Sequence, residues 1–190
     1  MANVDAARGL IPRMKADGSM VGASNLYYIP DTDATAAYVG GLVKLLGTST
    51  ARGVPHVDPD VSTGDTVVGV ITGFAPATRD STVYGAASTE RFVFVCDDPD
   101  VLFEVQSDGD LDETDTNAVA DLTGFTSGST TTGYSSIEIS NGTITASGDG
   151  TEDVQIVRLV DRPDNEFGDF GKALVRLNLH VRRTNANTGS

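Results

Sequence analysis

Apolar and polar side chains alternate along much of this 190-residue chain, in short runs separated by clusters of Gly, Asp, Ser and Thr. In Ala173–Val181 the odd-numbered residues are Ala, Val or Leu, whereas the even-numbered ones include Arg176, Asn178 and His180. Successive side chains of a β-strand point to opposite faces, so this run predicts a strand with one buried face. Repeated runs of this kind predict a mainly β protein, an antiparallel β sandwich or barrel.

The run Arg91–Cys96 differs because both of its faces are apolar. Phe92 and Phe94 lie on one face, and Val93 and Val95 lie on the other. A strand of this composition is predicted to be buried on both sides, within the core or at a contact between subunits. Further strands are predicted at Asn25–Ile29, Ala37–Leu46, Thr66–Phe74, Val101–Gln106 and Val154–Val160.

One tight turn and one helix are also predicted. Asn141-Gly142 separates two alternating runs, and Asn-Gly accepts the positive φ angles of a type I′ turn. A β-hairpin is therefore predicted over Tyr134–Ala146. Leu111–Leu122 is the single helix candidate, since its first turn is acidic and would complement the helix dipole. The fold prediction thus includes at most one short helix.

Irregular segments define the expected domain organisation. Residues 1–24 have weak periodicity and are predicted to form an extended N-terminal arm, followed by a β domain over 25–183. Residues 47–64 and 123–133 are rich in turn-forming residues and are predicted to be loops. The polar segment 184–190 is predicted to be a flexible tail.

The charge of the chain disfavours several classes of partner. There are 27 acidic and 13 basic residues, which gives a formal net charge of −14. Phosphate backbones and anionic lipids both repel such a surface, so we expect neither nucleic acid nor membrane as a partner. No apolar run approaches the length of a membrane span, and the N-terminus lacks the apolar core of a signal peptide. We therefore expect a protein that stays in the cytoplasm, or in a particle assembled there.

Residues with catalytic potential are few. The two histidines, His56 and His180, are predicted to be exposed, and no G-x-S-x-G elbow accompanies them. Cys96 is the single cysteine; it excludes an intrachain disulfide and is predicted to be a small buried hydrophobic residue. No phosphate-binding loop or dinucleotide fingerprint occurs. We expect no enzyme activity and no cofactor.

An acidic run invites a calcium hypothesis. Its five members are Asp108, Asp110, Asp112, Glu113 and Asp115. An EF-hand loop that started at the first of them would have glycine at its sixth position and glutamate at its twelfth, and this sequence has neither. A solvated acidic loop is the preferred interpretation, and no metal site is predicted.

Several blocks of the chain, in one order, resemble a group of tailed-bacteriophage virion proteins that are encoded near the major capsid protein. The blocks are Ala2–Arg13 (ANVDAARGLIPR), Tyr27–Leu45 (YYIPDTDATAAYVGGLVKL), Gly64–Phe74 (GDTVVGVITGF), Ser88–Gln106 (STERFVFVCDDPDVLFEVQ) and Arg162–His180 (RPDNEFGDFGKALVRLNLH). The resemblance is weakest over residues 107–150. None of these blocks is a catalytic motif.

The resemblance implies a capsid decoration or cement protein. Such a protein binds the outside of a phage head, often as a homotrimer, and holds neighbouring capsomers together. Its partners would be the major capsid protein and further copies of itself, and its location would be the virion exterior. The alternatives are a minor head, spike or tail component, a carbohydrate-binding adhesin module and, last, a hydrolase.

The apolar residues of the arm and the aromatic residues of two strands are the candidate contacts with other subunits or with the capsid. They are Val4, Leu10, Ile11, Tyr27, Tyr28, Phe92 and Phe94.

Overall fold

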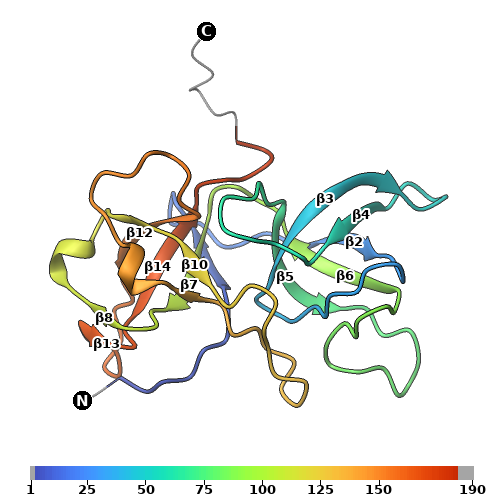
Figure 1. Ribbon diagram of the computed structural model, residues 1–190, viewed down its shortest axis with the longest axis horizontal. Helices are drawn as coiled ribbons and strands as arrows, with labels where there is room; N and C mark the ends of the chain where they lie inside the picture. The colour runs from blue at the N-terminus through green and yellow to red at the C-terminus, as the bar shows by residue number, and fades with distance from the viewer. Residues whose placement is uncertain (1–2, 184–190) are drawn as a thin grey trace, which may run out of the picture.

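The computed structural model describes residues 3–183, and the predicted tail at 184–190 lies outside them. The chain is mainly β, as predicted, and is built from two modules that lie side by side in Figure 1. One module is a closed barrel, with strand order β2-β4-β3-β5-β6. Its strands are β2 (Asn25–Ile29), β3 (Leu42–Ser49), β4 (Pro55–Asp58), β5 (Gly69–Phe74) and β6 (Arg91–Cys96). All its pairings are antiparallel except the parallel pair β2–β4.

The second module is an antiparallel sheet with strand order β1-β7-β14-β12-β9. Its strands are β1 (Ile11–Lys15), β7 (Val101–Gln106), β9 (Val119–Ala120), β12 (Val154–Leu159) and β14 (Lys172–Leu177). Two small pairs accompany it: β10 (Leu122–Thr123) with β11 (Glu138–Ile139), and β8 (Asp110–Leu111) with β13 (Gly168–Asp169). Two single 3-10 turns complete the elements: η1 (Glu113–Asp115) and η2 (Asn141–Thr143).

Each module has its own apolar core, and the barrel strands contribute to both. Val43 and Ile71 belong to the barrel core, whereas their neighbours Leu42 and Val70 belong to the core of the sheet. Alternate side chains of one strand point to opposite faces, so β3 and β5 present one residue to each core. Strand β6 does the same at its end, where Cys96 enters the core of the sheet. The two modules are therefore joined through shared strands.

Strand β6 is buried on one face only over Phe92 and Phe94. Val93 and Val95 are fully buried in the barrel, whereas Phe92 and Phe94 are each 40% exposed on its outer face. The prediction that this strand is covered on both sides is not met within the isolated chain. Its outer face is accessible to solvent at Phe92 and Phe94 and is covered at Cys96, where the strand enters the core of the sheet.

The N-terminal segment contains a regular strand, which the arm prediction did not include. Strand β1 pairs antiparallel with β7, with a register shift between Pro12 and Met14. Proline cannot donate a ladder hydrogen bond, and it is tolerated here because β1 is the edge strand of its sheet. Within β1 this bulge interrupts the alternation of faces.

The predicted hairpin over Tyr134–Ala146 is wrong. Asn141 and Gly142 lie in the 3-10 turn η2, and neither has a positive φ angle. The strand before them, β11, pairs with β10 instead of with the segment that follows. The amide N–H of Asn141 donates to Oδ1 of Asp108 (2.8 Å), so a tertiary contact replaces the local turn.

The predicted helix at Leu111–Leu122 is also absent. This segment contains the end of β8, the single turn η1, strand β9 and the start of β10. Apolar residues of the segment, including Leu111 and Ala120, are buried in the core of the sheet. Short β-pairings bury them there, and they outweigh the weak helix preference of the segment.

Several strand boundaries differ from prediction; for example, β5 begins at Gly69 rather than Thr66. Strand β3 begins at Leu42 rather than Ala37 and runs to Ser49, and β4 lies inside the segment 47–64 that was predicted to be a loop. Strand β14 ends at Leu177, after which the chain turns, so that His180 is buried and Val181 is exposed. The alternation predicted through Val181 is therefore reversed beyond the end of the strand.

Candidate interaction surface

The outer face of the barrel carries two apolar cross-strand pairs. Leu26 on β2 lies opposite Phe94 on β6, and Tyr28 lies opposite Phe92. The rings of Tyr28 and Phe92 meet edge to face, with centroids 5.0 Å apart. Directly opposite residues on one face of an antiparallel pair are the closest side-chain neighbours in a sheet. The alternation of β2 and β6 thus places both pairs on the side away from the barrel core.

A groove forms beside these pairs because strand β5 and the residue that follows it are small there. Gly73 is the β5 partner of Phe94, and the amide N–H of Ala75 donates to the carbonyl oxygen of Phe92 (2.9 Å). A glycine and an alanine leave the flanks of both phenylalanines uncovered. The tip of the β3–β4 hairpin, Thr50–Val54, lies at the border of this space.

We call this space the barrel groove. Its volume is about 700 Å3. Its lining residues are Leu26, Thr50, Ala51, Arg52, Val54, Ala75, Phe92 and Phe94. Most of them are apolar, and one, Arg52, is charged. Among residues 3–183 the side chain of Arg52 has no ion pair and no hydrogen bond.

A polar edge lies next to the groove. The hydroxyl of Tyr28 donates to Oε2 of Glu90 (2.5 Å), and this hydrogen bond, with a smaller effect of burial, raises the pKa of Tyr28 to about 12. The ring of His56 lies 5.0 Å from that of Tyr28, and its Nδ1 lies 2.9 Å from the hydroxyl oxygen of Thr48. Tyr28 therefore stays a neutral hydrogen-bond donor over the physiological range of pH.

Tyr27 points to the opposite side of β2 and is buried. Its hydroxyl donates to Oδ2 of Asp97 (2.7 Å), and burial followed by this hydrogen bond raises its pKa to about 12. The guanidinium of Arg182 lies 2.7 Å from the same oxygen. Tyr27 thus attaches the C-terminal segment to the barrel and presents no surface to a partner.

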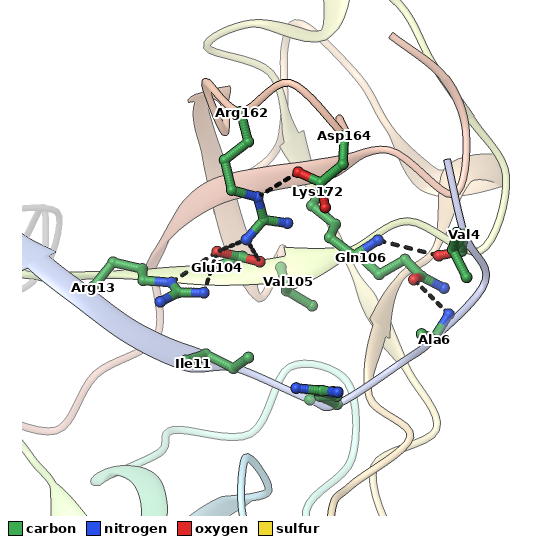
Figure 2. Close-up of a pocket in the computed structure, with 12 residues that line it drawn as sticks. Val4, Ala6, Ile11, Arg13, Glu104, Val105, Gln106, Arg162, Asp164 and Lys172 are labelled. Carbon is green, nitrogen blue, oxygen red and sulfur yellow. Dashed lines mark hydrogen bonds and ion pairs between the residues drawn. The ribbon is translucent and has the colours of Figure 1, made fainter. Parts of the chain in front are cut away.

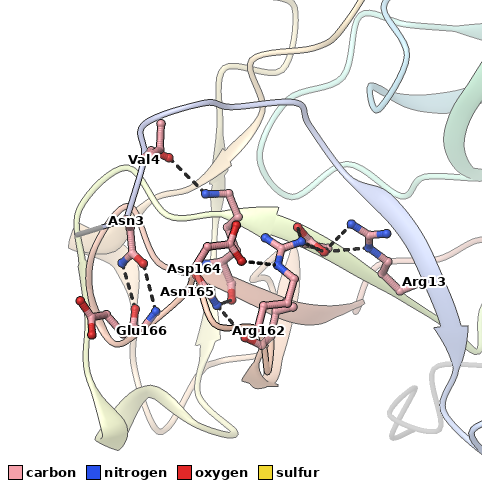
Figure 3. A network of polar contacts seen from close by, with 10 residues as sticks. Asn3, Val4, Arg13, Arg162, Asp164, Asn165 and Glu166 are labelled. Carbon is pink, nitrogen blue, oxygen red and sulfur yellow. Dashed lines mark hydrogen bonds and ion pairs between the residues drawn. The ribbon is translucent and has the colours of Figure 1, made fainter. Parts of the chain in front are cut away.

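The candidate residues of the N-terminal arm have three different environments. Val4 is 68% exposed, Ile11 is half-buried in β1, and Leu10 is fully buried in the core of the sheet. The arm is held by polar contacts (Figure 3). The side chain of Asn3 donates to the carbonyl oxygen of Glu166 (2.9 Å) and accepts from the amide N–H of Glu166 (3.0 Å). It also donates to the carbonyl oxygen of Asp169 (2.9 Å).

Further along, the arm arches away from the sheet and rejoins it, and a pocket of about 350 Å3 lies beneath it (Figure 2). Lys172 Nζ donates to the carbonyl oxygen of Val4 (3.1 Å), and the amide N–H of Ala6 donates to Oε1 of Gln106 (2.9 Å). At the far end of the pocket, Glu104 is held between Arg13 and Arg162. The arm is therefore packed on its own chain.

The Glu104 cluster was not predicted from the sequence. Glu104 is 4% exposed; its Oε2 lies 2.7 Å from Nη2 of Arg13, and its Oε1 lies 2.9 Å from Nη1 of Arg162. A buried carboxylate is stable when paired cations and hydrogen bonds replace its hydration. The sequence signal for a buried, paired carboxylate was the acidic Glu104 within the largely apolar run VLFEVQ. The sequence did not indicate which arginines would pair with it.

His180 and Cys96, two residues with catalytic potential, are both buried. His180 is buried, contrary to the prediction that it is exposed, and burial lowers its pKa. Its Nδ1 accepts a hydrogen bond from the amide N–H of Arg182 (3.1 Å). Cys96 is buried, as predicted, and burial raises the pKa of its thiol. A buried thiol with a raised pKa is a poor nucleophile.

The acidic run is spread over different elements. Asp108 accepts a hydrogen bond from Asn141, and Oδ2 of Asp115 accepts one from the amide N–H of Asp112 (2.7 Å). Within residues 3–183, no three His, Cys, Asp or Glu side chains come together as potential metal ligands. Nor does this part of the chain contain a helix that is long and apolar enough to cross a lipid bilayer.

Comparisons with protein-family models, curated proteins and solved structures found no match to this chain. Of the seven candidate contact residues, Tyr28, Phe92 and Phe94 gather on the outer face of the barrel, whereas Val4 and Ile11 lie at the arm pocket. Leu26 and Arg52 complete the barrel groove and were not predicted from the sequence.

Proposed function

We propose that this protein is a structural component of a bacteriophage virion, a capsid decoration or cement protein. It binds the outer surface of the head through the major capsid protein and stabilises contacts between capsomers. Its role is attachment rather than catalysis. It acts as a homotrimer on the virion exterior, after assembly in the host cytoplasm. The resemblance of five sequence blocks to phage virion proteins supports this proposal.

The observation that carries the proposal is the apolar outer face of the barrel. Phe92, Phe94 and Leu26 are exposed together on a chain whose net charge is −14. High net charge favours solubility and suppresses random association, so a gathered apolar face on such a chain marks a contact surface. The groove is lined by apolar side chains with one arginine, which suits a protein partner.

The arrangement of the chain also suits a role in attachment. The arm is held on its own sheet by Asn3, Lys172 and Gln106, so a folded, preformed body meets the shell. Preorganised surfaces lose less conformational entropy on binding. Many copies on one lattice then multiply weak individual contacts into stable attachment.

Removal and re-addition of the protein tests the proposal. Heads that lack the protein are expected to release DNA at a lower temperature than complete heads, because binding to the assembled lattice stabilises that state. Adding purified protein should restore the original release temperature and saturate at a fixed number of copies per head. If stripped heads are as stable as complete heads while adsorption to host cells falls, the protein is an adhesin and the proposal is wrong.

A further inference from the structure

We propose that the barrel groove receives a segment of the shell protein that presents an apolar side chain with a carboxylate beside it. The identity of the partner rests on the proposed function, whereas the chemistry of the segment follows from the groove alone. The apolar side chain occupies the space between the phenylalanines and the hairpin tip, and the carboxylate pairs with Arg52.

The apolar part of the inference follows from the shape of the groove. The pair Leu26–Phe94 provides one apolar wall, and Val54 from the hairpin tip provides another. Gly73 contributes no side chain beside Phe94, so the ring is open to contact on that flank. A groove of this kind favours one inserted apolar side chain, because burying it removes apolar area from water on both partners.

The charged part follows from Arg52. Three other arginines are paired with carboxylates, Arg13 and Arg162 with Glu104 and Arg182 with Asp97. Arg52 lines an apolar groove without a carboxylate among the described residues, although the chain carries 27 acidic residues. A guanidinium is suited to bidentate pairing with a carboxylate, so the complementary group is expected on the partner.

The bulk charge of the protein makes this inference testable with small molecules. A chain of net charge −14 attracts cations and repels anions at long range. Preferential binding of an anion at the groove would therefore report the local effect of Arg52. Three probes share one apolar body and differ in charge: 4-phenylbutyrate, 4-phenyl-1-butanol and 4-phenylbutylamine.

Each probe is titrated into 15N-labelled protein at constant ionic strength and followed by NMR. Chemical-shift changes are expected at Leu26, Arg52 and Phe94. The carboxylate should bind roughly two- to fivefold more tightly than the alcohol, the range expected for a solvent-exposed ion pair. The amine should bind more weakly than the alcohol. An amine that binds as well as the carboxylate, or shift changes that avoid the groove, would overturn the inference.

Two matched pairs of variants assign the effect to the groove. Phe94→Ser should abolish the shift changes for all three probes, whereas Phe167→Ser, at an equally exposed phenylalanine (39%), should leave them unchanged. Arg52→Glu should reverse the order of carboxylate and amine. Arg79→Glu, at an exposed arginine that lies outside the groove lining, should leave the order unchanged. Unchanged amide spectra away from the substitution show that each variant is folded.

Rebinding of the variants to stripped heads identifies the occupant. Phe94→Ser and Arg52→Glu should each lower occupancy at a fixed protein concentration, and the two control variants should not. If both groove variants bind heads normally, the shell segment is the wrong occupant, while the proposed function stands on another surface. If Phe94→Ser instead dissociates a homo-oligomer, the occupant is a second copy of the chain. If wild-type protein fails to bind heads, the proposed function is wrong. The titrations with the three probes would still test which chemical groups bind in the groove.

Discussion

Gly9 in the N-terminal arm lies directly against Gly40, which precedes barrel strand β3. A Cβ atom added to Gly9 would lie 2.5 Å from the carbonyl oxygen of Gly40, and one added to Gly40 would collide with the carbonyl oxygen of Arg8. The amide N–H of Leu10 donates to the carbonyl oxygen of Gly40 (2.9 Å). This contact of two backbones seats Leu10 in the core and joins the arm to the start of the barrel.

This contact predicts that Gly40→Ala greatly lowers the stability of the protein. Gly40 has a φ angle of +84°, and the added methyl group has no space, so the variant should lose at least about 2 kcal/mol of unfolding free energy. Gly18→Ala is the matched control, because Gly18 has the same φ angle and an open environment. It should lose about 1 kcal/mol in urea denaturation. Equal losses would show that the arm does not pack against the barrel.

The Glu104 cluster predicts a loss of stability in Glu104→Gln. The substitution leaves the guanidiniums of Arg13 and Arg162 facing a neutral amide. Both arginines are partly solvent-exposed, so the expected loss is about 2 kcal/mol, below that for a fully buried pair. Asp164→Asn removes an exposed partner of Arg162 and should change stability by less than about 0.5 kcal/mol. Urea unfolding measures the stability of both variants. A Glu104→Gln variant as stable as the wild-type protein would contradict a structural role for the cluster.

His180 predicts a loss of stability on acidification. Its pKa is lower in the folded protein than in the unfolded chain, mainly because of burial, so the unfolded chain binds the proton more tightly. The contribution of neutral His180 to the free energy of unfolding is therefore fully present above the unfolded pKa of about 6.5. It is lost as pH falls through the folded pKa. Protonation would also prevent Nδ1 from accepting the hydrogen bond of Arg182.

Urea midpoints measured from pH 8 to pH 5 test this assignment by comparing wild-type protein with His180→Asn. Burial raises the pKa values of Asp153 and Glu138, so the pH dependence of their effect on stability is opposite to that of His180. Each carboxyl group stabilises the fold at low pH, and this stabilisation is lost as pH rises through its folded pKa. The difference between the two proteins cancels these contributions. A difference that does not change with pH would mean that His180 titrates normally in the folded state.

The proposed homotrimer predicts one defined species in sedimentation. Wild-type protein at micromolar concentration should sediment with three times the mass of the chain. Val4 and Val83, which are exposed apolar residues outside the barrel groove, are described candidates for such contacts. A clean monomer over the same concentration range would exclude a trimer that forms before the protein reaches the head.

The candidate surface was partly predictable. The alternation of β6 predicted that Phe92 and Phe94 share a face. The β2–β6 register decided that Tyr28 lies beside them on the outer face of the barrel. The groove also depends on Gly73 lying beside Phe94 and on the hairpin tip at Arg52, which are far from β6 in the sequence. The partners of Glu104 were unpredictable for the same reason, since Arg13 and Arg162 lie far from it along the chain.

The sequence by itself determined the β class, several of the main strands, including β2, β6 and β7, and the burial of Cys96. These features depend on side-chain alternation and on apolarity, which are local properties of the chain. The tertiary structure decided the features that depend on competition between local preference and distant contacts. Asn141 forms a 3-10 turn because Asp108 binds its amide, and Leu111–Leu122 is not a helix because short β-pairings bury its apolar residues. The strand β1 and the position of Leu10 were decided in the same way, because β7 and Gly40 provide the partners that the arm sequence lacks within itself.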